Sequence, residues 1–186
     1  MYHVYLSIRY RIKVEGDLKA IKDKRFIVAS NHVSGADPFI LCGKLKRPLA
    51  FMAKKELFEK FFSRRLMDFC GAFSVNREKL EVSTIKTAIS IKDTKWTLSL
   101  FPQGTRDKTG NIQKVNKGFA SIAKATKSDI LPVAITKQKT KALWPFSEKI
   151  TVKIGEIIPY SDNIEDMMTQ WVDAVTMLLN NNVAQA

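Results

Sequence analysis

A histidine and an aspartate in the segment NHVSGADPF, residues 31–39, are spaced so that they can act as a pair. His32 precedes Asp37 by five residues, and Gly35 between them permits a tight turn that brings the carboxylate to the imidazole ring. A carboxylate there fixes the tautomer of the histidine and stabilises the imidazolium, so the histidine can serve as a general base. The same segment is also typical of a plain strand-to-helix turn, with Asp37 as the helix N-cap and Pro38 at the first helical position. Both interpretations are open at this point.

Cations and small polar residues follow other apolar runs of the chain. In FPQGTR, residues 101–106, Gly104 permits close approach of the backbone, Thr105 offers a hydroxyl and an amide, and Arg106 is suited to bidentate phosphate recognition. Arg77 follows AFSVN, and Lys54 follows LAFMA. A solvated cation at a strand end is the simpler alternative for each. Several cations around one histidine indicate an anionic substrate.

Alternating strands and helices must position these residues. Apolar runs and alternating patterns predict strands at 10–16, 25–30, 49–53, 72–77, 96–101, 129–135 and 149–155. Helical spacings predict helices that begin at Asp37 and that span 54–69, 79–92, 118–125 and 164–179. This order predicts one α/β domain, residues 1–186, with a largely parallel mixed sheet flanked by helices. The loops that follow parallel strands then gather at one edge of the sheet.

The composition is that of a basic globular protein. Lys and Arg number 31 against 18 Asp and Glu, which gives a formal net charge of +13 and favours anionic partners such as nucleic acid, an anionic membrane surface or an acidic protein. The aromatic residues lie in apolar runs and no nucleic-acid-binding motif is present, so nucleic acid is not the expected partner. No apolar run approaches the roughly 18 residues of a membrane span. Cys42 and Cys70 are expected to be buried reduced thiols in a reducing compartment, and no Cys/His cluster predicts a metal site.

Four blocks occur together in a characteristic order. NHVSGADPF, GAFSVNR, FPQGTR and ILPVAI resemble, in sequence and approximate spacing, the four blocks of the glycerolipid acyltransferases, most closely the bacterial lysophosphatidic acid acyltransferases. The similarity extends from about residue 10 to residue 155. Four ordered blocks are far more specific than any single one.

The resemblance implies acyl transfer from acyl-CoA or acyl-carrier protein to the sn-2 hydroxyl of lysophosphatidic acid, which gives phosphatidic acid. In that family the histidine of the first block is the general base and the aspartate its partner, here His32 and Asp37. The third block binds the acceptor phosphate, a role that falls on the segment 103–106, and Lys54 and Arg77 are further candidates. Ser34 could be imagined as a nucleophile beside His32, but it also suits a loop or capping role and is not expected to be catalytic. No cofactor is implied beyond the thioester co-substrate.

Two positions depart from the family pattern. Gln103 stands where the third block usually has glutamate, and Asn76 precedes Arg77 where the second block often has aspartate. Both changes remove a negative charge and keep hydrogen-bonding capacity. Two alternatives are therefore open: another acceptor, such as glycerol-3-phosphate or a lysophospholipid, and a non-catalytic domain that binds lipid or nucleic acid.

The lipid substrates imply a peripheral enzyme on the cytoplasmic face of a membrane. The segment KKELFEKFFSRRLMDF, residues 54–69, combines aromatic and basic residues as interfacial helices do. It is equally typical of a core helix with solvated cations, and this is the simpler interpretation. KALWPFS, residues 141–147, carries the same two alternatives. An acyl-carrier protein is an expected partner because it is acidic, and the sequence makes no prediction of oligomeric state.

Overall fold

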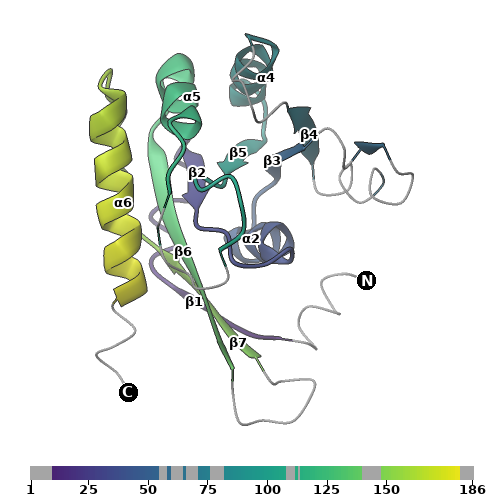
Figure 1. Cartoon of the computed structure of the whole chain (residues 1–186), viewed down its shortest axis with the longest axis vertical. Helices are drawn as coiled ribbons and strands as arrows, with labels where there is room; N and C mark the ends of the chain where they lie inside the picture. Colours follow the sequence, from purple (N-terminus) through teal and green to yellow (C-terminus); the bar gives the residue numbers. More distant parts are fainter. Residues whose placement is uncertain are drawn as a thin grey trace.

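The computed structural model describes residues 10–54, 58, 59, 65, 71–75, 82–107, 112, 114–139 and 148–180. Within this part of the chain, seven strands form one sheet with helices on both faces (Figure 1). The strands are β1 (Tyr10–Glu15), β2 (Ile27–Ser30), β3 (Leu49–Lys54), β4 (Ala72–Val75), β5 (Thr97–Leu100), β6 (Ile130–Lys139) and β7 (Glu148–Ile154). The helices are α2 (Asp37–Leu45), α4 (Val82–Lys92), α5 (Gly118–Thr126) and α6 (Ile164–Asn180).

The sheet has the strand order β1-β7-β6-β2-β5-β3-β4. All neighbouring strands pair in parallel except β6 and β7, which are antiparallel. The prediction of an α/β fold with a largely parallel mixed sheet is confirmed. Strand β2 lies between β5 and β6 and parallel to both, so the loops that follow β2 and β5 leave the same edge of the sheet.

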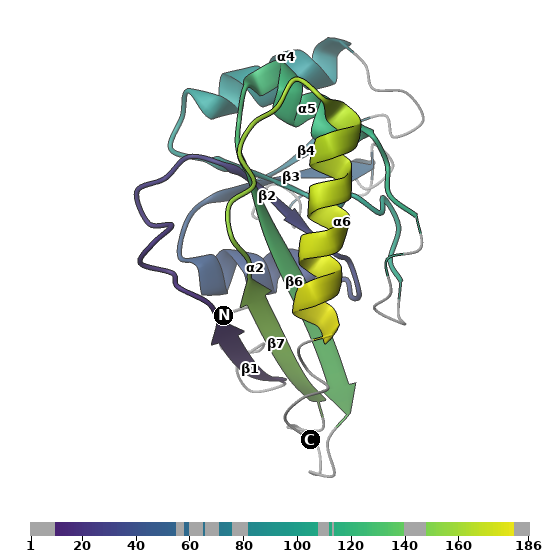
Figure 2. The same ribbon diagram turned by 90° about the vertical axis from the view of Figure 1, so that its left-hand side faces the viewer.

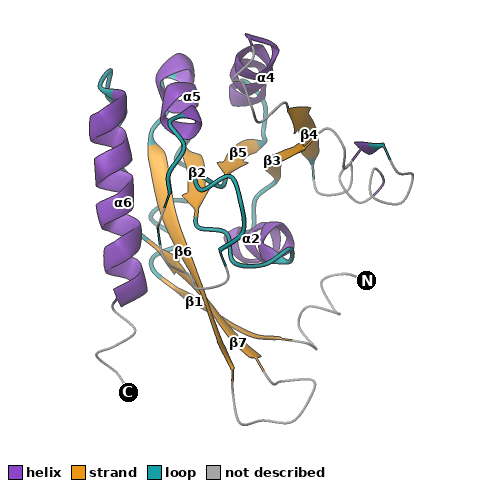
Figure 3. Cartoon of the chain, viewed as in Figure 1, coloured by secondary structure: helices purple, strands orange, loops and turns teal. Residues whose placement is uncertain are grey.

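Two layers of helices cover the sheet. Helix α2 packs on one face, and helices α4, α5 and α6 pack on the other (Figure 3). Side chains of β2 alternate between the two cores: Val28 lies in the cluster with α2, whereas Ile27 and Ala29 lie in the cluster with α5 and α6. All four residues of β2 are buried, which explains why its sequence is a continuous apolar run.

Helix α6 is built on a regular apolar stripe. Met167, Trp171 and Val175 recur every four residues and are buried against the sheet. Asn163 caps the helix, because its side-chain oxygen accepts hydrogen bonds from the backbone N–H groups of the second and third residues of α6, at 3.1 and 3.2 Å. The indole N–H of Trp171 donates to the carbonyl oxygen of Ala29 at 2.9 Å, which ties the helix to the central strand.

Several expected elements differ in detail. Strand β6 continues four residues past the predicted end at residue 135, because residues 133–139 pair with all of β7, and Figure 2 shows this pair running beyond the central strands. Its exposed polar residues, 137–139, hide the strand from an analysis based on apolar runs. The helix proposed at 54–69 and the segment 141–147 lie outside the described residues, apart from residues 54, 58, 59 and 65.

The prediction of Asp37 as a helix N-cap is wrong. Ala36 is the N-cap and makes no side-chain capping bond, while Asp37 is the first residue of α2 and Pro38 follows it. The Asp37 carboxylate is directed back toward the preceding loop, where it accepts hydrogen bonds from residues 32–34.

The structure describes one of the two cysteines. Cys42 is a free, partly buried thiol on α2, and burial raises its pKa. Cys70 lies outside the described residues.

No helix among the described residues is long and apolar enough to cross a membrane.

We predict that Trp171→Ala lowers the free energy of unfolding by about 3–5 kcal/mol, because it removes a fully buried indole and its hydrogen bond. The matched control is Met177→Ala on the same helix, where the side chain is 67% exposed and the cost is expected within about 0.5 kcal/mol. Urea unfolding followed by circular dichroism measures both. Equal losses in the two variants would contradict the packing described for α6.

Candidate active site

His32 and Asp37 form a hydrogen-bonded pair at the carboxyl end of β2. The ring nitrogen Nδ1 of His32 lies 2.7 Å from Oδ2 of Asp37. The carboxylate is fully buried, whereas the imidazole is 13% exposed. The first of the two interpretations of NHVSGADPF, a working pair rather than a plain turn, therefore has the geometry that it requires.

The carboxylate is held by its own loop. Oδ2 of Asp37 also accepts hydrogen bonds from the backbone N–H groups of Val33 and Ser34, at 2.7 and 2.8 Å. Its second oxygen, Oδ1, is buried without a hydrogen-bond partner among the described residues. An ionised carboxylate can only accept, so Nδ1 of His32 carries the proton in this pair. The lone pair of Nε2 is then available, and this atom has no hydrogen-bond partner in the described part of the chain.

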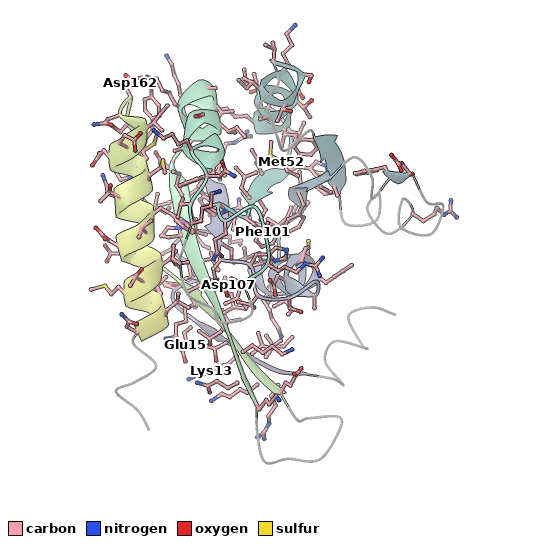
Figure 4. All side chains as sticks on the ribbon, viewed as in Figure 1. Lys13, Glu15, Met52, Phe101, Asp107 and Asp162 are labelled. Atoms are coloured by element: carbon pink, nitrogen blue, oxygen red, sulfur yellow. The ribbon has the colours of Figure 1, made fainter. Side chains whose placement is uncertain are left out.

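The loop after β5 holds the backbone of His32 from both sides. The backbone N–H of His32 donates to the side-chain oxygen Oε1 of Gln103 at 3.0 Å. The backbone N–H of Asp107 donates to the carbonyl oxygen of His32 at 2.8 Å. Figure 4 labels Phe101 and Asp107 on this loop. The first and third sequence blocks are therefore one structural unit.

An aromatic ring supports the imidazole. Phe101 stacks on His32 with a centroid separation of 4.0 Å and an interplanar angle of 18°. Phe51 from β3 stacks behind Phe101 at 5.9 Å. This stack favours one orientation of the imidazole ring.

Asn31 links the site to β6. Its amide donates to the carbonyl oxygen of Ile135 at 2.9 Å, and its side-chain oxygen accepts the N–H of Ile135 at 2.6 Å. The side chain is fully buried. The residue before His32 is thus fixed to a strand more than one hundred residues later in the chain.

The segment 103–106 forms a turn beside the His32–Asp37 loop. Gly104 adopts φ +71°, which glycine permits without strain, and its N–H donates to the carbonyl oxygen of Phe101 at 2.9 Å. Thr105 and Arg106 are exposed. Nη1 of Arg106 lies 3.6 Å from the position that a β-carbon on Gly35 would occupy, so the guanidinium lies over the loop that carries the base.

The remaining predicted residues are less defined. Lys54 is the last residue of β3, beside β5 in the sheet, and its side chain is outside what the structure describes. Arg77 and Asn76 lie outside the described residues. The structure thus brings His32, Asp37 and the segment 103–106 together.

The family model for Acyltransferase matches residues 11–136, which is more than half of the chain and contains every residue of the site described above. The chain belongs to the acyltransferase family. The matched range also includes β2 to β5, all of β1 except Tyr10, and most of β6.

Relatives within the acyltransferase family are similar over much of the chain. The 1-acyl-sn-glycerol-3-phosphate acyltransferase of Streptococcus pneumoniae (strain ATCC BAA-255 / R6) is 32% identical over 156 residues, which cover 83% of this chain and 57% of that protein. The protein of the same name from Bacillus subtilis (strain 168) is 28% identical over 183 residues, 98% of this chain and 91% of its own. Thus the chain spans little more than half the length of the first relative and nearly all of the second.

A solved structure has the same fold. The 1-acyl-sn-glycerophosphate (LPA) acyltransferase PlsC from Thermotoga maritima superposes with a TM-score of 0.77 at 24% sequence identity, covering 100% of this chain and 77% of that one. At this identity the likeness establishes the acyltransferase fold of the chain.

Four contributions to the site were not predicted from the sequence. They are the double hydrogen bond of Asn31, the stacking of Phe101 on His32, the bond from the Asp107 amide and the bond from the His32 amide to the Gln103 side chain. The blocks themselves carried a signal for the first two, because Asn31 adjoins His32 and Phe101 begins FPQGTR. Nothing in local sequence signals a bond made by a backbone amide.

We predict that Gln103→Ala weakens protection of the His32 amide against hydrogen exchange, because it removes the side-chain oxygen that accepts the hydrogen bond of that N–H. A lost bond of about 1 kcal/mol corresponds to about fivefold faster exchange, measured by NMR. Gln103→Glu keeps an acceptor oxygen and should retain the protection. Unchanged exchange in Gln103→Ala would contradict the role of the side chain.

Proposed function

We propose that this protein transfers an acyl group from an acyl thioester to the sn-2 hydroxyl of lysophosphatidic acid, giving phosphatidic acid for phospholipid synthesis. The observation that carries the proposal is the His32–Asp37 pair, in which Nδ1 is occupied by the carboxylate and Nε2 is available as a base. The names of the relatives from Streptococcus pneumoniae and Bacillus subtilis support the choice of acceptor.

The proposed reaction is a direct displacement. Nε2 of His32 takes the proton of the acceptor hydroxyl as its oxygen attacks the thioester carbonyl, and Asp37 stabilises the imidazolium that forms. The new C–O bond forms, the tetrahedral intermediate collapses, and the C–S bond breaks. The leaving thiolate takes the proton back from the imidazolium. The stacked ring of Phe101 keeps the imidazole in one orientation during the step.

The segment 103–106 is the proposed phosphate-binding element. Arg106 lies over Gly35, within the loop that joins the base to its carboxylate, so a phosphate bound there is close to His32. Gly104 leaves the backbone accessible, and Thr105 adds a hydroxyl. Lys54 and Arg77 are further proposed contacts on the basis of the sequence blocks alone.

The hydrogen bond of Gln103 supports lysophosphatidic acid as the acceptor, although glutamate is usual at this position of the third block. Its oxygen accepts from the His32 N–H, and a glutamate oxygen would do the same. The missing charge therefore leaves the positioning of the base intact. A glycerol-3-phosphate or lysophospholipid acceptor is the second candidate, and it would follow if the lost carboxylate selected among acceptors.

The proposed setting is peripheral, on the cytoplasmic face of a membrane that supplies the lipid acceptor. The donor is acyl-CoA or acyl-carrier protein, and both are acidic and thus attracted to a chain with net charge +13. No cofactor is proposed beyond this co-substrate.

His32→Ala is expected to reduce acceptor-dependent thiol release about 10²–10⁴-fold, because it removes the general base. Asp37→Asn should also lower kcat, since a carboxamide no longer holds the Nδ1 proton. Thiol release from palmitoyl-CoA and palmitoyl-carrier protein, with lysophosphatidic acid present and phosphatidic acid identified by mass spectrometry, measures both. Full activity of a correctly folded His32→Ala variant would refute the mechanism.

Arg106→Ala is expected to raise the KM for lysophosphatidic acid by about 10- to 30-fold with a smaller change in kcat, because a charge-assisted phosphate contact is worth about 2 kcal/mol. Lys149→Ala, which removes an exposed cation on β7, is the control and should leave the KM unchanged. Replacement of lysophosphatidic acid by glycerol-3-phosphate or lysophosphatidylcholine tests the second candidate. An equal effect of the two variants would argue against a specific phosphate contact.

A further inference from the structure

A cavity lies at the opposite edge of the sheet from His32. It has a volume of about 180 Å³ and opens between the amino ends of β2 and β5 and the carboxyl ends of α4 and α5. At about 30 Å³ per water molecule, it has room for roughly six waters, which suits a phosphate or pyrophosphate group. Phe26 lines the cavity and precedes His32 by six residues, so at ~3.3 Å per residue the two sites are about 20 Å apart.

The lining is strongly basic. Six cationic residues and a single acidic residue, Asp23, contribute to it. None of the six takes part in an ion pair within the described part of the chain. The six cations are Lys22, Lys24, Arg25, Arg47, Lys92 and Lys95.

Three of these cations are already ordered by the protein. Arg25 donates to the carbonyl oxygen of Lys92, and Lys92 donates to that of Thr126 at the end of α5. Arg47 donates from Nη2 to the carbonyl oxygen of Lys24 at 3.1 Å, and its guanidinium lies 4.5 Å from the ring centroid of Phe26. A ligand that met these groups would therefore cost little additional side-chain entropy.

Arg47 has a buried, unused donor. Its Nη1 is inaccessible to solvent and has no hydrogen-bond partner among the described residues. Burial also lowers the pKa of this guanidinium, because no anion compensates for its lost hydration. An anion in the cavity would offset the uncompensated charge of this guanidinium.

The partial negative charges of the nearby helix ends do not neutralise the six cations of the cavity. The carboxyl ends of α4 and α5 each carry about half a negative charge, and Arg25 and Lys92 already bond to them. Four further cations remain, opposed by Asp23 alone. The electrostatic potential of the cavity therefore favours an anion.

We propose that this cavity binds a phosphate-bearing ligand at a site separate from the His32 site. The ligand is either a soluble phosphate compound or the phosphate headgroup of a lipid, since both present the same group to Arg47 and its neighbours. The inference does not depend on the proposed acyl transfer.

Calorimetric titration of the full chain with inorganic pyrophosphate, and sedimentation with phosphatidylcholine vesicles with and without phosphatidic acid, test the site. The cavity variant is Lys22→Glu with Lys95→Glu, both exposed positions. Its control, Lys86→Glu with Lys149→Glu, makes the same change in net charge at exposed positions outside the cavity. Arg47→Gln tests the buried donor, and Arg106→Ala tests whether binding takes place at the other site.

The expected result is saturable binding by the parent that weakens about tenfold or more in the cavity variant and in Arg47→Gln, and stays within about twofold in the control. The binding that is lost in the cavity variant should persist in Arg106→Ala. Such binding with pyrophosphate identifies a soluble ligand, and such binding only with phosphatidic acid vesicles identifies a headgroup. Absence of binding to both probes, an equal loss in the two charge-reversed variants, or a loss confined to Arg106→Ala would overturn the proposal.

Discussion

The buried negative charge of Asp37 determines the shape of the loop that precedes it. A carboxylate removed from water is costly unless it is hydrogen-bonded, and no lysine or arginine of the described residues is paired with this one. Its Oδ2 instead collects three donors from residues 32–34, all of which precede it in sequence. The loop must curl back over the start of α2 to supply them. The orientation of the imidazole ring follows from that curl, and so does the availability of Nε2.

The strands on either side of β2 also fix the positions of Asn31 and His32. Residues of the β5 loop hold the backbone of His32 and stack on its ring, while β6 holds the side chain of Asn31. Parallel pairing makes this possible, because it places the carboxyl ends of β2 and β5 together, while β6 continues past the end of β2 to reach Asn31. The amino ends of the same strands meet at the opposite edge, where a different group of cations surrounds the cavity lined by Phe26 and Arg47. One sheet thus separates two basic regions that have different surroundings.

Much of this fold could be predicted because the signals are local and periodic. The continuous apolar run of β2 and the stripe of Met167, Trp171 and Val175 each led to an element with nearly the observed bounds. The contacts within the site could not be predicted in the same way, because the partner of the His32 amide is a side chain 71 residues away. The N-cap expectation for Asp37 was wrong for a related reason: an Asp-Pro pair at a helix start has the same local pattern whether the carboxylate turns toward the helix or toward the loop. The cations that line the cavity at the amino ends of the strands come from three separate segments of the chain, and only the folded chain shows that they meet.

The double hydrogen bond between Asn31 and Ile135 also has a consequence for biosynthesis. Asn31 is translated 104 residues before Ile135, its partner in β6. Contacts of such long range form slowly, since a long stretch of chain must be ordered to close them. A nascent chain that ends before β6 therefore carries the histidine and aspartate without the strand that fixes them. Ribosome-bound intermediates of this protein should lack an organised site until β6 has emerged and inserted beside β2.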